Sequence, residues 1–178
     1  GGKLTGLSIQ VNGKTDGNSQ GDFDTMQILG HLPILLAEKP ERVCVIGFGT
    51  GVTAGVTTQY SEVKQVDIVE INPMVLEAGK LFTFANYNVL SNPKTHVFMM
   101  DAFRFFRATA QSHDLIISEP SNPWMAGVEN LFSRDFYEMA HGNLTDPGVF
   151  VQWFHGYNLS ADTLKLILNT FRSVFPYY

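Results

Sequence analysis

The sequence is poor in cysteine, in runs of basic residues and in long apolar segments. Cys44 is the only cysteine among 178 residues, so an internal disulfide is excluded, and its apolar neighbours predict a buried position. The formal net charge is −5 and no basic run occurs, which argues against nucleic-acid binding. No apolar stretch reaches the roughly 18 residues of a membrane span, and no signal peptide is recognisable. A cytoplasmic domain is therefore expected.

Common catalytic and metal-binding motifs are also missing. The five histidines show no metal-ligand spacing such as H-E-x-x-H, so no metal site is predicted. No G-x-S-x-G elbow occurs and Cys44 lies within an apolar run, which leaves covalent nucleophilic catalysis without a candidate. Acids and glycines remain as the residues that can carry chemistry.

Short apolar runs alternate regularly with helical stretches from residue 42 onward. Five runs predict strands, at 43–46, 66–69, 96–99, 115–117 and 149–153. The stretches that follow them predict helices, at 52–59, 73–84, 102–110, 134–143 and 162–174. Repeated strand–helix units with right-handed crossovers indicate a mainly parallel sheet covered on both faces, which is a doubly wound α/β fold.

The first 25 residues differ from the rest. Apolar and polar residues alternate around Asn12-Gly13, a dipeptide that favours a tight hairpin turn. A helix is predicted over 25–37. Its predicted apolar face consists of Ile28, Leu29, Leu32, Leu35 and Leu36. We therefore divide the chain into a small N-terminal β-hairpin and loop segment, residues 1–25, and an α/β domain, residues 26–178.

Three glycines follow the first predicted strand of the α/β domain. Gly47, Gly49 and Gly51 let the backbone turn sharply and approach a ligand, and the next helix offers free N–H groups. A dinucleotide fingerprint would need its third small residue at Val52, one position later. The spacing therefore favours the G-x-G-x-G loop of class I methyltransferase-like folds over a NAD site.

The next two strand ends carry acids, at the edge where such sheets bind ligands. Glu70 comes about 20 residues after Gly51, the interval at which an acid accepts from ribose hydroxyls. The alternative is that Glu70 caps the helix that starts near Pro73. Asp101 either accepts from an adenine amino group or caps the following helix, and these two roles are compatible.

The fourth predicted strand runs into "SEPSNPWMAG", a proline-bracketed loop with Glu119 near its start. A carboxylate there can take a proton from an attacking amine or hold a cation. The alternative is a loop acid that accepts backbone N–H groups. Trp124 either covers a cationic or sulfonium ligand with its ring face or packs the loop against the domain.

The fifth strand end and the N-terminal segment supply further candidates. Gln152 and Trp153 are expected on the pocket wall, and His155 is the histidine expected near the cleft. Asp16, Asp22 and Asp24 are candidate acids for a polyamine, the alternative being solvated loop aspartates.

With these strand ends assembled, the sequence resembles the spermidine synthase family of aminopropyltransferases. The matching segments are "VCVIGFGTG", "VDIVEINPMVLEAGK", "DAFRFF", "DLIISEPSNP", "ENLFSRDFYEMA" and "GVFVQW". The similarity covers most of the chain from about Asn12, and it is closest to the branch whose "SEPSNPWMAG" loop often follows an integral-membrane segment. It implies a class I methyltransferase-like Rossmann domain that lacks its final strands, and a membrane segment in a longer parent chain.

The resemblance implies decarboxylated S-adenosylmethionine as co-substrate, a small amine or polyamine as acceptor, and Glu119 as the catalytic residue. The residues implied to bind the nucleoside are Gly47, Gly49, Thr50, Gly51, Glu70, Ile71, Asp101 and Ala102. The residues expected at the amine are Asp16, Ser121, Asn122, Trp124 and Gln152.

The chain departs from the family pattern at positions that, in the family, bind the substrate. Thr50 stands where the family has the aspartate that holds the aminopropyl ammonium, and Asn122 replaces the second aspartate of the mobile loop. A tyrosine–glutamine pair is replaced by Thr25-Met26, and Glu119 is a longer acid than the usual aspartate. Altered amine specificity is therefore expected.

Three functions stay open on the sequence alone. The first is an aminopropyltransferase. The second is an S-adenosylmethionine-dependent methyltransferase, which Thr50 favours because a repulsion against the carboxylate of intact S-adenosylmethionine is lost. The third is a non-catalytic nucleoside-binding regulatory domain. The strand at 149–153 would be an unpaired edge, which predicts either a homodimer or a loss of stability there.

Overall fold

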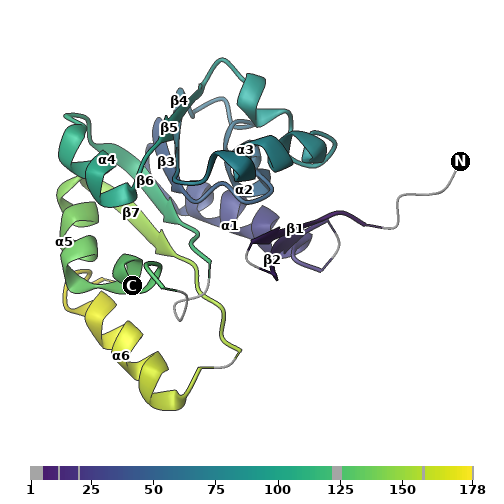
Figure 1. The fold of residues 1–178 in the computed structure, drawn as a ribbon. Coiled ribbons are helices and arrows are strands. Elements are labelled where there is room, and N and C mark those ends of the chain that lie inside the picture. Colours follow the sequence, from purple (N-terminus) through teal and green to yellow (C-terminus); the bar gives the residue numbers. More distant parts are fainter. Residues whose placement is uncertain (1–5, 12, 20, 122–125, 158, 178) are drawn as a thin grey trace, which may run out of the picture.

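A computed structural model describes residues 6–11, 13–19, 21–121, 126–157 and 159–177. Its central feature is a five-stranded sheet of order β5-β4-β3-β6-β7, in which all neighbouring pairs are parallel (Figure 1). The strands are β3 (Arg42–Ile46), β4 (Gln65–Glu70), β5 (Thr95–Met99), β6 (His113–Ser118) and β7 (Leu144–Gln152). The predicted doubly wound α/β fold is confirmed.

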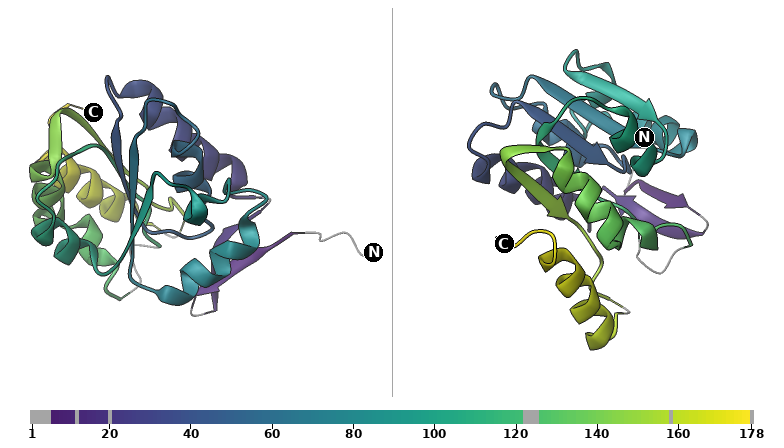
Figure 2. Two further views of the ribbon diagram at one scale, coloured as in Figure 1. Left: turned by 90° about the horizontal axis from the view of Figure 1, so that it is seen from above. Right: turned by 90° about the vertical axis from the view of Figure 1, so that its left-hand side faces the viewer.

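Helices cover both faces of the sheet (Figure 2). One face carries α1 (Phe23–Leu36), α2 (Val52–Thr57) and α3 (Pro73–Gly79), and the other α4 (Ala102–Ala108), α5 (Arg134–Gly142) and α6 (Ala161–Arg172). Val43 and Val45 point into the first core, whereas Cys44 and Ile46 point into the second. Because both faces of the strand are buried, the strand is a continuous apolar run rather than an alternating one.

The predicted elements occur close to their expected positions, with two adjustments. The helix predicted at 73–84 is divided into α3 and the 3₁₀ turn η1 (Lys80–Phe82). Two further 3₁₀ turns, η2 (Val89–Ser91) and η3 (Glu129–Phe132), lie in connections. β7 starts at Leu144, earlier than predicted, and it pairs with β6 through an irregularity between His113 and Leu115.

The predicted apolar face of α1 is wrong. Leu29 is buried as expected, but Ile28, Leu32, Leu35 and Leu36 are each more than half exposed. The helix instead buries Met26, Gly30, Pro33 and Ile34. A Cβ atom on Gly30 would lie 2.7 Å from the Cβ atom of Val56, so α1 and α2 are in close contact at this glycine. The close approach at Gly30 sets the rotation of the helix and leaves the leucines outside.

The N-terminal segment forms the predicted hairpin, with β1 (Ser8–Val11) antiparallel to β2 (Lys14–Asn18). The hairpin packs on the glycine loop, because a Cβ atom on Gly17 would lie 3.1 Å from Thr50 Cγ2. Ile9 is only 5% exposed. The division of the chain at residue 25 stays a prediction.

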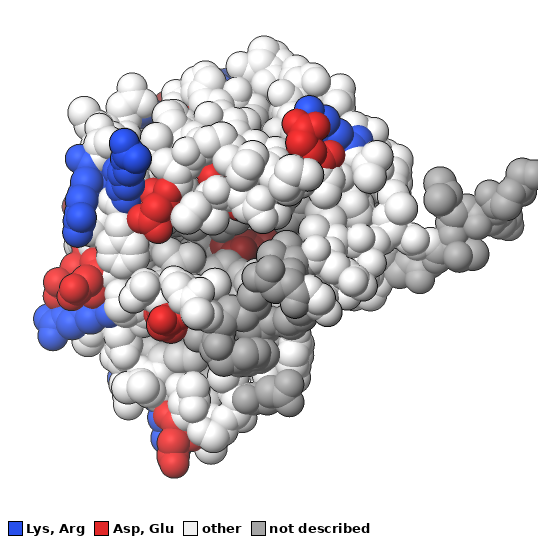
Figure 3. Space-filling view, in the orientation of Figure 1, with Lys and Arg blue, Asp and Glu red and all other residues white. Residues whose placement is uncertain are grey.

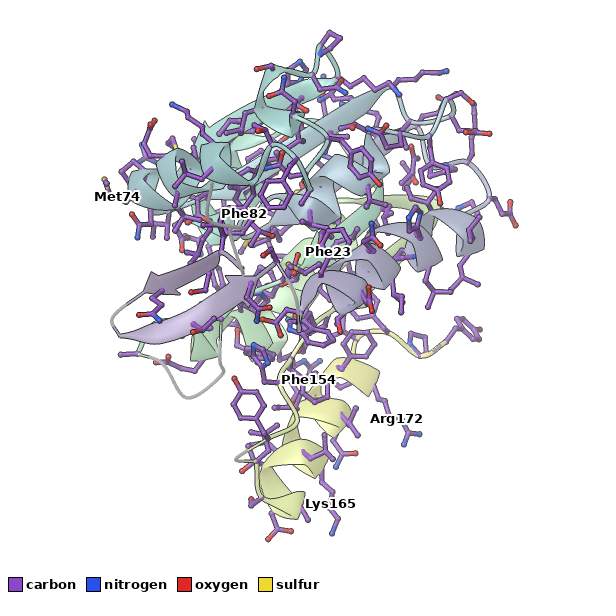
Figure 4. The ribbon with its side chains drawn as sticks, turned by 90° about the vertical axis from the view of Figure 1, so that its right-hand side faces the viewer. Phe23, Met74, Phe82, Phe154, Lys165 and Arg172 are labelled. Carbon is purple, nitrogen blue, oxygen red and sulfur yellow. The ribbon has the colours of Figure 1, made fainter. Side chains whose placement is uncertain are left out.

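The other end of the chain is less enclosed. Among the described strands β7 pairs only with β6. The N-terminal end of α6 projects from the body of the molecule, with Lys165 and Arg172 pointing outward (Figure 4), whereas Phe171 at the other end packs on Tyr137 and Phe150. Ile167 is the buried residue of this helix. No helix in the described ranges combines the length and hydropathy that a bilayer span requires. The homodimer and the membrane segment of a longer chain stay predictions.

Candidate active site

A cavity of about 280 Å³ lies where β3, β4, β6 and β7 end, and we call it the central cavity. The hairpin contributes Ile9 to its wall, and the start of α1 contributes Asp22. Its lining includes the carboxylates of Asp22, Glu70 and Glu119 but no described Lys or Arg. In Figure 3 acidic surface is visible inside a hollow, while the basic side chains lie toward the periphery. The cavity therefore favours cationic ligands.

The glycine loop is shaped by close backbone approaches. Gly47 has φ +87°, and a Cβ atom there would lie 2.5 Å from the carbonyl oxygen of Glu119. Gly51 has φ +79°, and its Cβ atom would meet the ring of Phe48. Gly49, also at positive φ, lines the central cavity. These positions need glycine because side chains are disfavoured at positive φ and, at Gly47 and Gly51, the space is filled.

Thr50, predicted to bind the cofactor, does not line the central cavity. Its side chain is 1% exposed, and its hydroxyl donates a hydrogen bond to Met26 Sδ at 3.1 Å. The residue therefore joins the loop to α1. Gly49 and Gly51 on either side turn the loop so that the Thr50 side chain points away from the cavity.

Glu70 lies at the cavity and is held by two backbone groups. Its Oε2 atom accepts from the Phe48 N–H at 2.9 Å, and its Oε1 atom accepts from the Asn72 N–H at 2.8 Å. The cap of α3 is Asn72 rather than Glu70. Each carboxylate oxygen can accept a second hydrogen bond, so Glu70 is fixed and still able to receive two hydroxyl donors.

A second cavity of about 380 Å³, the side cavity, adjoins the first. The two share Ile71, Ala126 and Val128 as lining residues. Asp101 and Ala102 lie in the side cavity, and Asp101 also caps α4 by accepting from the Arg104 N–H at 3.2 Å. Both roles predicted for Asp101 are therefore sterically compatible. Mostly apolar walls with one acid suit a planar heterocycle with an amino group.

Glu119 lies where β6 leaves the sheet and lines the central cavity. Its N–H donates to the Ile46 carbonyl at 2.8 Å, which fixes the strand end beside the glycine loop. Burial raises the pKa of the Glu119 carboxyl from 4.5 to about 7, and the neighbouring Thr53 side chain partly opposes this rise. A carboxyl with a pKa near neutrality is suited to accept and release a proton.

The structure separates the predicted amine-site residues. Ser121 lines the central cavity. Gln152 does not, because its side-chain amide donates to the carbonyls of Ser118 at 3.4 Å and Trp153 at 2.9 Å and so ties β6 to β7. The substrate role predicted for Gln152 is therefore not supported by its position. Asn122 and Trp124 lie outside the described residues, as does the side chain of Asp16.

Sequence reasoning missed several residues of the central cavity. Ile9, Val75 and Val128 are apolar and carry no chemical signal of their own. Only the packing of the hairpin and of α3 around the strand ends brings them to the wall. Trp153 and His155, expected near the cleft, do line it.

Comparison with known proteins places these features in a family. The model of the spermine/spermidine synthase domain matches residues 23–178. The polyamine aminopropyltransferase of Alkaliphilus oremlandii is 28% identical over 157 residues, which are 87% of this chain and 55% of that protein. The enzyme of the same name from Streptococcus pneumoniae is 30% identical over 152 residues, 85% of this chain and 52% of that protein. The chain thus spans about half the length of these relatives.

Solved structures show the same fold. A spermidine synthase crystallised with the transition-state analogue AdoDATO superimposes with a TM-score of 0.87 at 22% identity, covering 96% of this chain and 58% of that one. The Thermotoga maritima spermidine synthase gives 0.84 at 22% identity, covering 96% and 57%. Since the family model matches most of the chain, this protein belongs to the spermine/spermidine synthase family.

Proposed function

We propose that this chain transfers an aminopropyl group from decarboxylated S-adenosylmethionine to a small amine. The observation that carries the proposal is Glu119, a carboxyl whose pKa is raised to about 7 inside a cavity lined by acids and by no described Lys or Arg. The relatives named polyamine aminopropyltransferase support the same reaction.

In the proposed reaction the amine nitrogen attacks the aminopropyl carbon bonded to the sulfonium. The C–S bond breaks, its electron pair stays on sulfur, and methylthioadenosine leaves. The attacking amine loses a proton, which Glu119 accepts; an alkylammonium has a pKa of about 10.4, so a nearby acceptor helps to keep the amine neutral. Alignment within a cavity that excludes water supplies much of the remaining acceleration.

The nucleoside is proposed to bind across the two cavities. Glu70 would accept from the ribose hydroxyls through its remaining lone pairs, because its backbone bonds already fix the carboxylate. The side cavity would take the adenine, with Asp101 near its amino group and Ala102 and Ile71 on the wall. Ile71 lines both cavities and would therefore lie beside the bond that joins the ribose to the adenine.

The same charges oppose methyl transfer from intact S-adenosylmethionine. Its amino-acid carboxylate would meet Asp22, Glu70 and Glu119 in the central cavity, with no described Lys or Arg on the lining to balance it. We therefore expect decarboxylated S-adenosylmethionine to bind roughly tenfold or more tightly than S-adenosylmethionine. Calorimetric titration of the folded chain with both compounds and with methylthioadenosine measures this difference.

The reaction itself is tested by following methylthioadenosine during incubation of decarboxylated S-adenosylmethionine with putrescine, spermidine and longer amines. Product formation with at least one amine is expected. If intact S-adenosylmethionine binds more tightly and a labelled methyl group is transferred, the proposed function is wrong and the chain is a methyltransferase. Nucleoside binding without turnover would leave a non-catalytic regulatory domain.

A further inference from the structure

The three carboxylates of the central cavity are not equivalent. Both oxygens of Glu70 accept backbone N–H groups that hold the glycine loop and the start of α3. Glu119 is the proton acceptor in the proposed reaction. Asp22 is the remaining acid of the described lining, and nothing in the proposed reaction uses it. Among the described lining residues, this carboxylate is the partner left for a second positive group on a ligand.

Asp22 occupies the N-cap position of α1 without capping the helix. An aspartate at this position usually accepts from an N–H of the first turn. Here the backbone is helical, with φ −94° and ψ −10°, and the side chain makes no capping bond. Its Oδ2 atom instead accepts from the Asn18 side-chain amide at 2.5 Å, and Oδ1 has no hydrogen bond to another described residue. One carboxylate oxygen therefore has no partner among the described residues and can meet a ligand in the cavity.

The described residues around Asp22 offer no competing Lys or Arg. Thr25, Met26 and Gly49 also line the central cavity and are uncharged. The hydroxyl of Thr50 is directed to the sulfur of Met26 and does not reach the cavity. A cation that enters here is therefore expected to pair with Asp22 alone.

We propose that Asp22 binds the primary ammonium group of the ligand that does not react. This inference rests on the proposed function, because it takes Glu119 as the group beside the reacting nitrogen. The ammonium comes either from the aminopropyl end of the donor or from the far end of a diamine acceptor. Asp22 is then a specificity-determining residue that holds charge and takes no part in bond breaking.

Two pairs of probes separate the two sources of the ammonium. Decarboxylated S-adenosylmethionine and methylthioadenosine differ by the aminopropyl group on sulfur. Putrescine and 1-aminobutane have the same carbon chain and differ by one ammonium, and they are titrated with methylthioadenosine present. Calorimetry gives two affinity ratios for the wild-type chain and for each variant.

Asp22→Asn is expected to lower one of these ratios by roughly 10- to 100-fold, the loss of one charge-assisted hydrogen bond. The affected pair identifies the source of the ammonium. The side-chain carbonyl of the new asparagine can still accept from Asn18, so the loop should keep its shape. Asp22→Glu, which restores the charge, should recover part of the lost ratio, and a merely structural role would not predict this charge dependence.

Asp24, also predicted from the sequence as an acid for the amine, is exposed in the first turn of the same helix and lies outside the cavity lining. Asp24→Asn removes the same charge there and is the matched control. It should leave both ratios unchanged. The inference is wrong if Asp22→Asn leaves both ratios at the wild-type value, or if the wild-type chain does not favour the ammonium-bearing member of either pair. A third outcome is an affinity ratio that depends on the charge at residue 22 without formation of methylthioadenosine. It would contradict the proposed function but support ammonium binding by Asp22.

Discussion

Replacing Glu119 by glutamine is expected to lower the rate constant of aminopropyl transfer by roughly 10²- to 10⁴-fold, the usual contribution of a positioned proton acceptor. Glutamine keeps the size of the side chain but cannot take a proton. The measurement is methylthioadenosine formation in single turnovers with saturating donor and amine. Nucleoside affinity should change little, because that part of the ligand is proposed to bind Glu70 and the side cavity.

Glu129→Gln is the matched control for this experiment. Glu129 is exposed on η3 and lines neither cavity, and its replacement removes the same charge. Its rate should equal that of the wild-type chain. A Glu119→Gln variant that keeps more than about a tenth of the rate would remove Glu119 from the mechanism, since a general base contributes at least about 10².

The raised pKa of Glu119 also predicts a pH-dependent stability. Well below pH 4.5 the carboxyl is protonated in both the folded and the unfolded chain and has no effect. Between pH 4.5 and about 7 the unfolded chain releases this proton while the folded chain keeps it, so the free energy of unfolding falls as pH rises. The full loss is about 3 kcal/mol, and above pH 7 it no longer grows.

Urea unfolding of the wild-type chain and of Glu119→Gln at pH 4 and pH 8 measures this effect. The variant should be more stable than the wild type by about 3 kcal/mol at pH 8 and equal to it at pH 4. Over the same range the transfer rate of the wild type should rise as Glu119 ionises. Equal differences at both pH values would mean that the carboxyl titrates normally.

Gly55→Ala is expected to destabilise the chain by about 3 kcal/mol or more, through overpacking against a backbone that cannot move. A Cβ atom on Gly55 of α2 would lie 2.6 Å from the carbonyl carbon of Asn86 and closer still to its oxygen. Asn86 is 1% exposed, and its side chain donates to the carbonyls of Thr50 and Gly79 at 2.9 Å. Retreat of Asn86 would break these bonds and loosen the glycine loop.

Gly142→Ala on α5 is the control for this substitution. A Cβ atom on Gly142 would have no heavy atom within 4 Å, and alanine favours a helix, so stability should be unchanged or slightly higher. Denaturant unfolding compares the two variants with the wild type. A loss below about 1 kcal/mol for Gly55→Ala would show that the loop around Asn86 yields at low cost.

Much of the fold could be predicted because the sheet is buried on both faces. Continuous apolar runs such as 43–46 have no other stable place in a domain of this size, and a glycine or an acid follows most of these runs closely. Gly47, Glu70 and Glu119 therefore reached the cavities as expected, since their backbone position alone brings them there.

Side-chain direction could not be predicted in the same way. Thr50 directly follows the cavity residue Gly49 in the sequence, yet glycines on both sides turn its hydroxyl to Met26. The leucines of α1 have helical spacing, but the contact at Gly30 rotates them outward. In both cases the deciding contact joins segments more than 20 residues apart and leaves no periodic trace in the sequence.

The hairpin that packs on the glycine loop bears on how such domains change over evolution. Ile9 forms part of the cavity wall and Gly17 packs against Thr50, so the segment before α1 shapes the same surface as the strand ends. A recombination event that exchanged the hairpin alone would introduce a cavity wall whose side chains do not pack on this chain's glycine loop. We expect substitutions at residues 9 and 17 to covary with substitutions at residues 26 and 50. Substrate preference in related domains would then depend on these positions together.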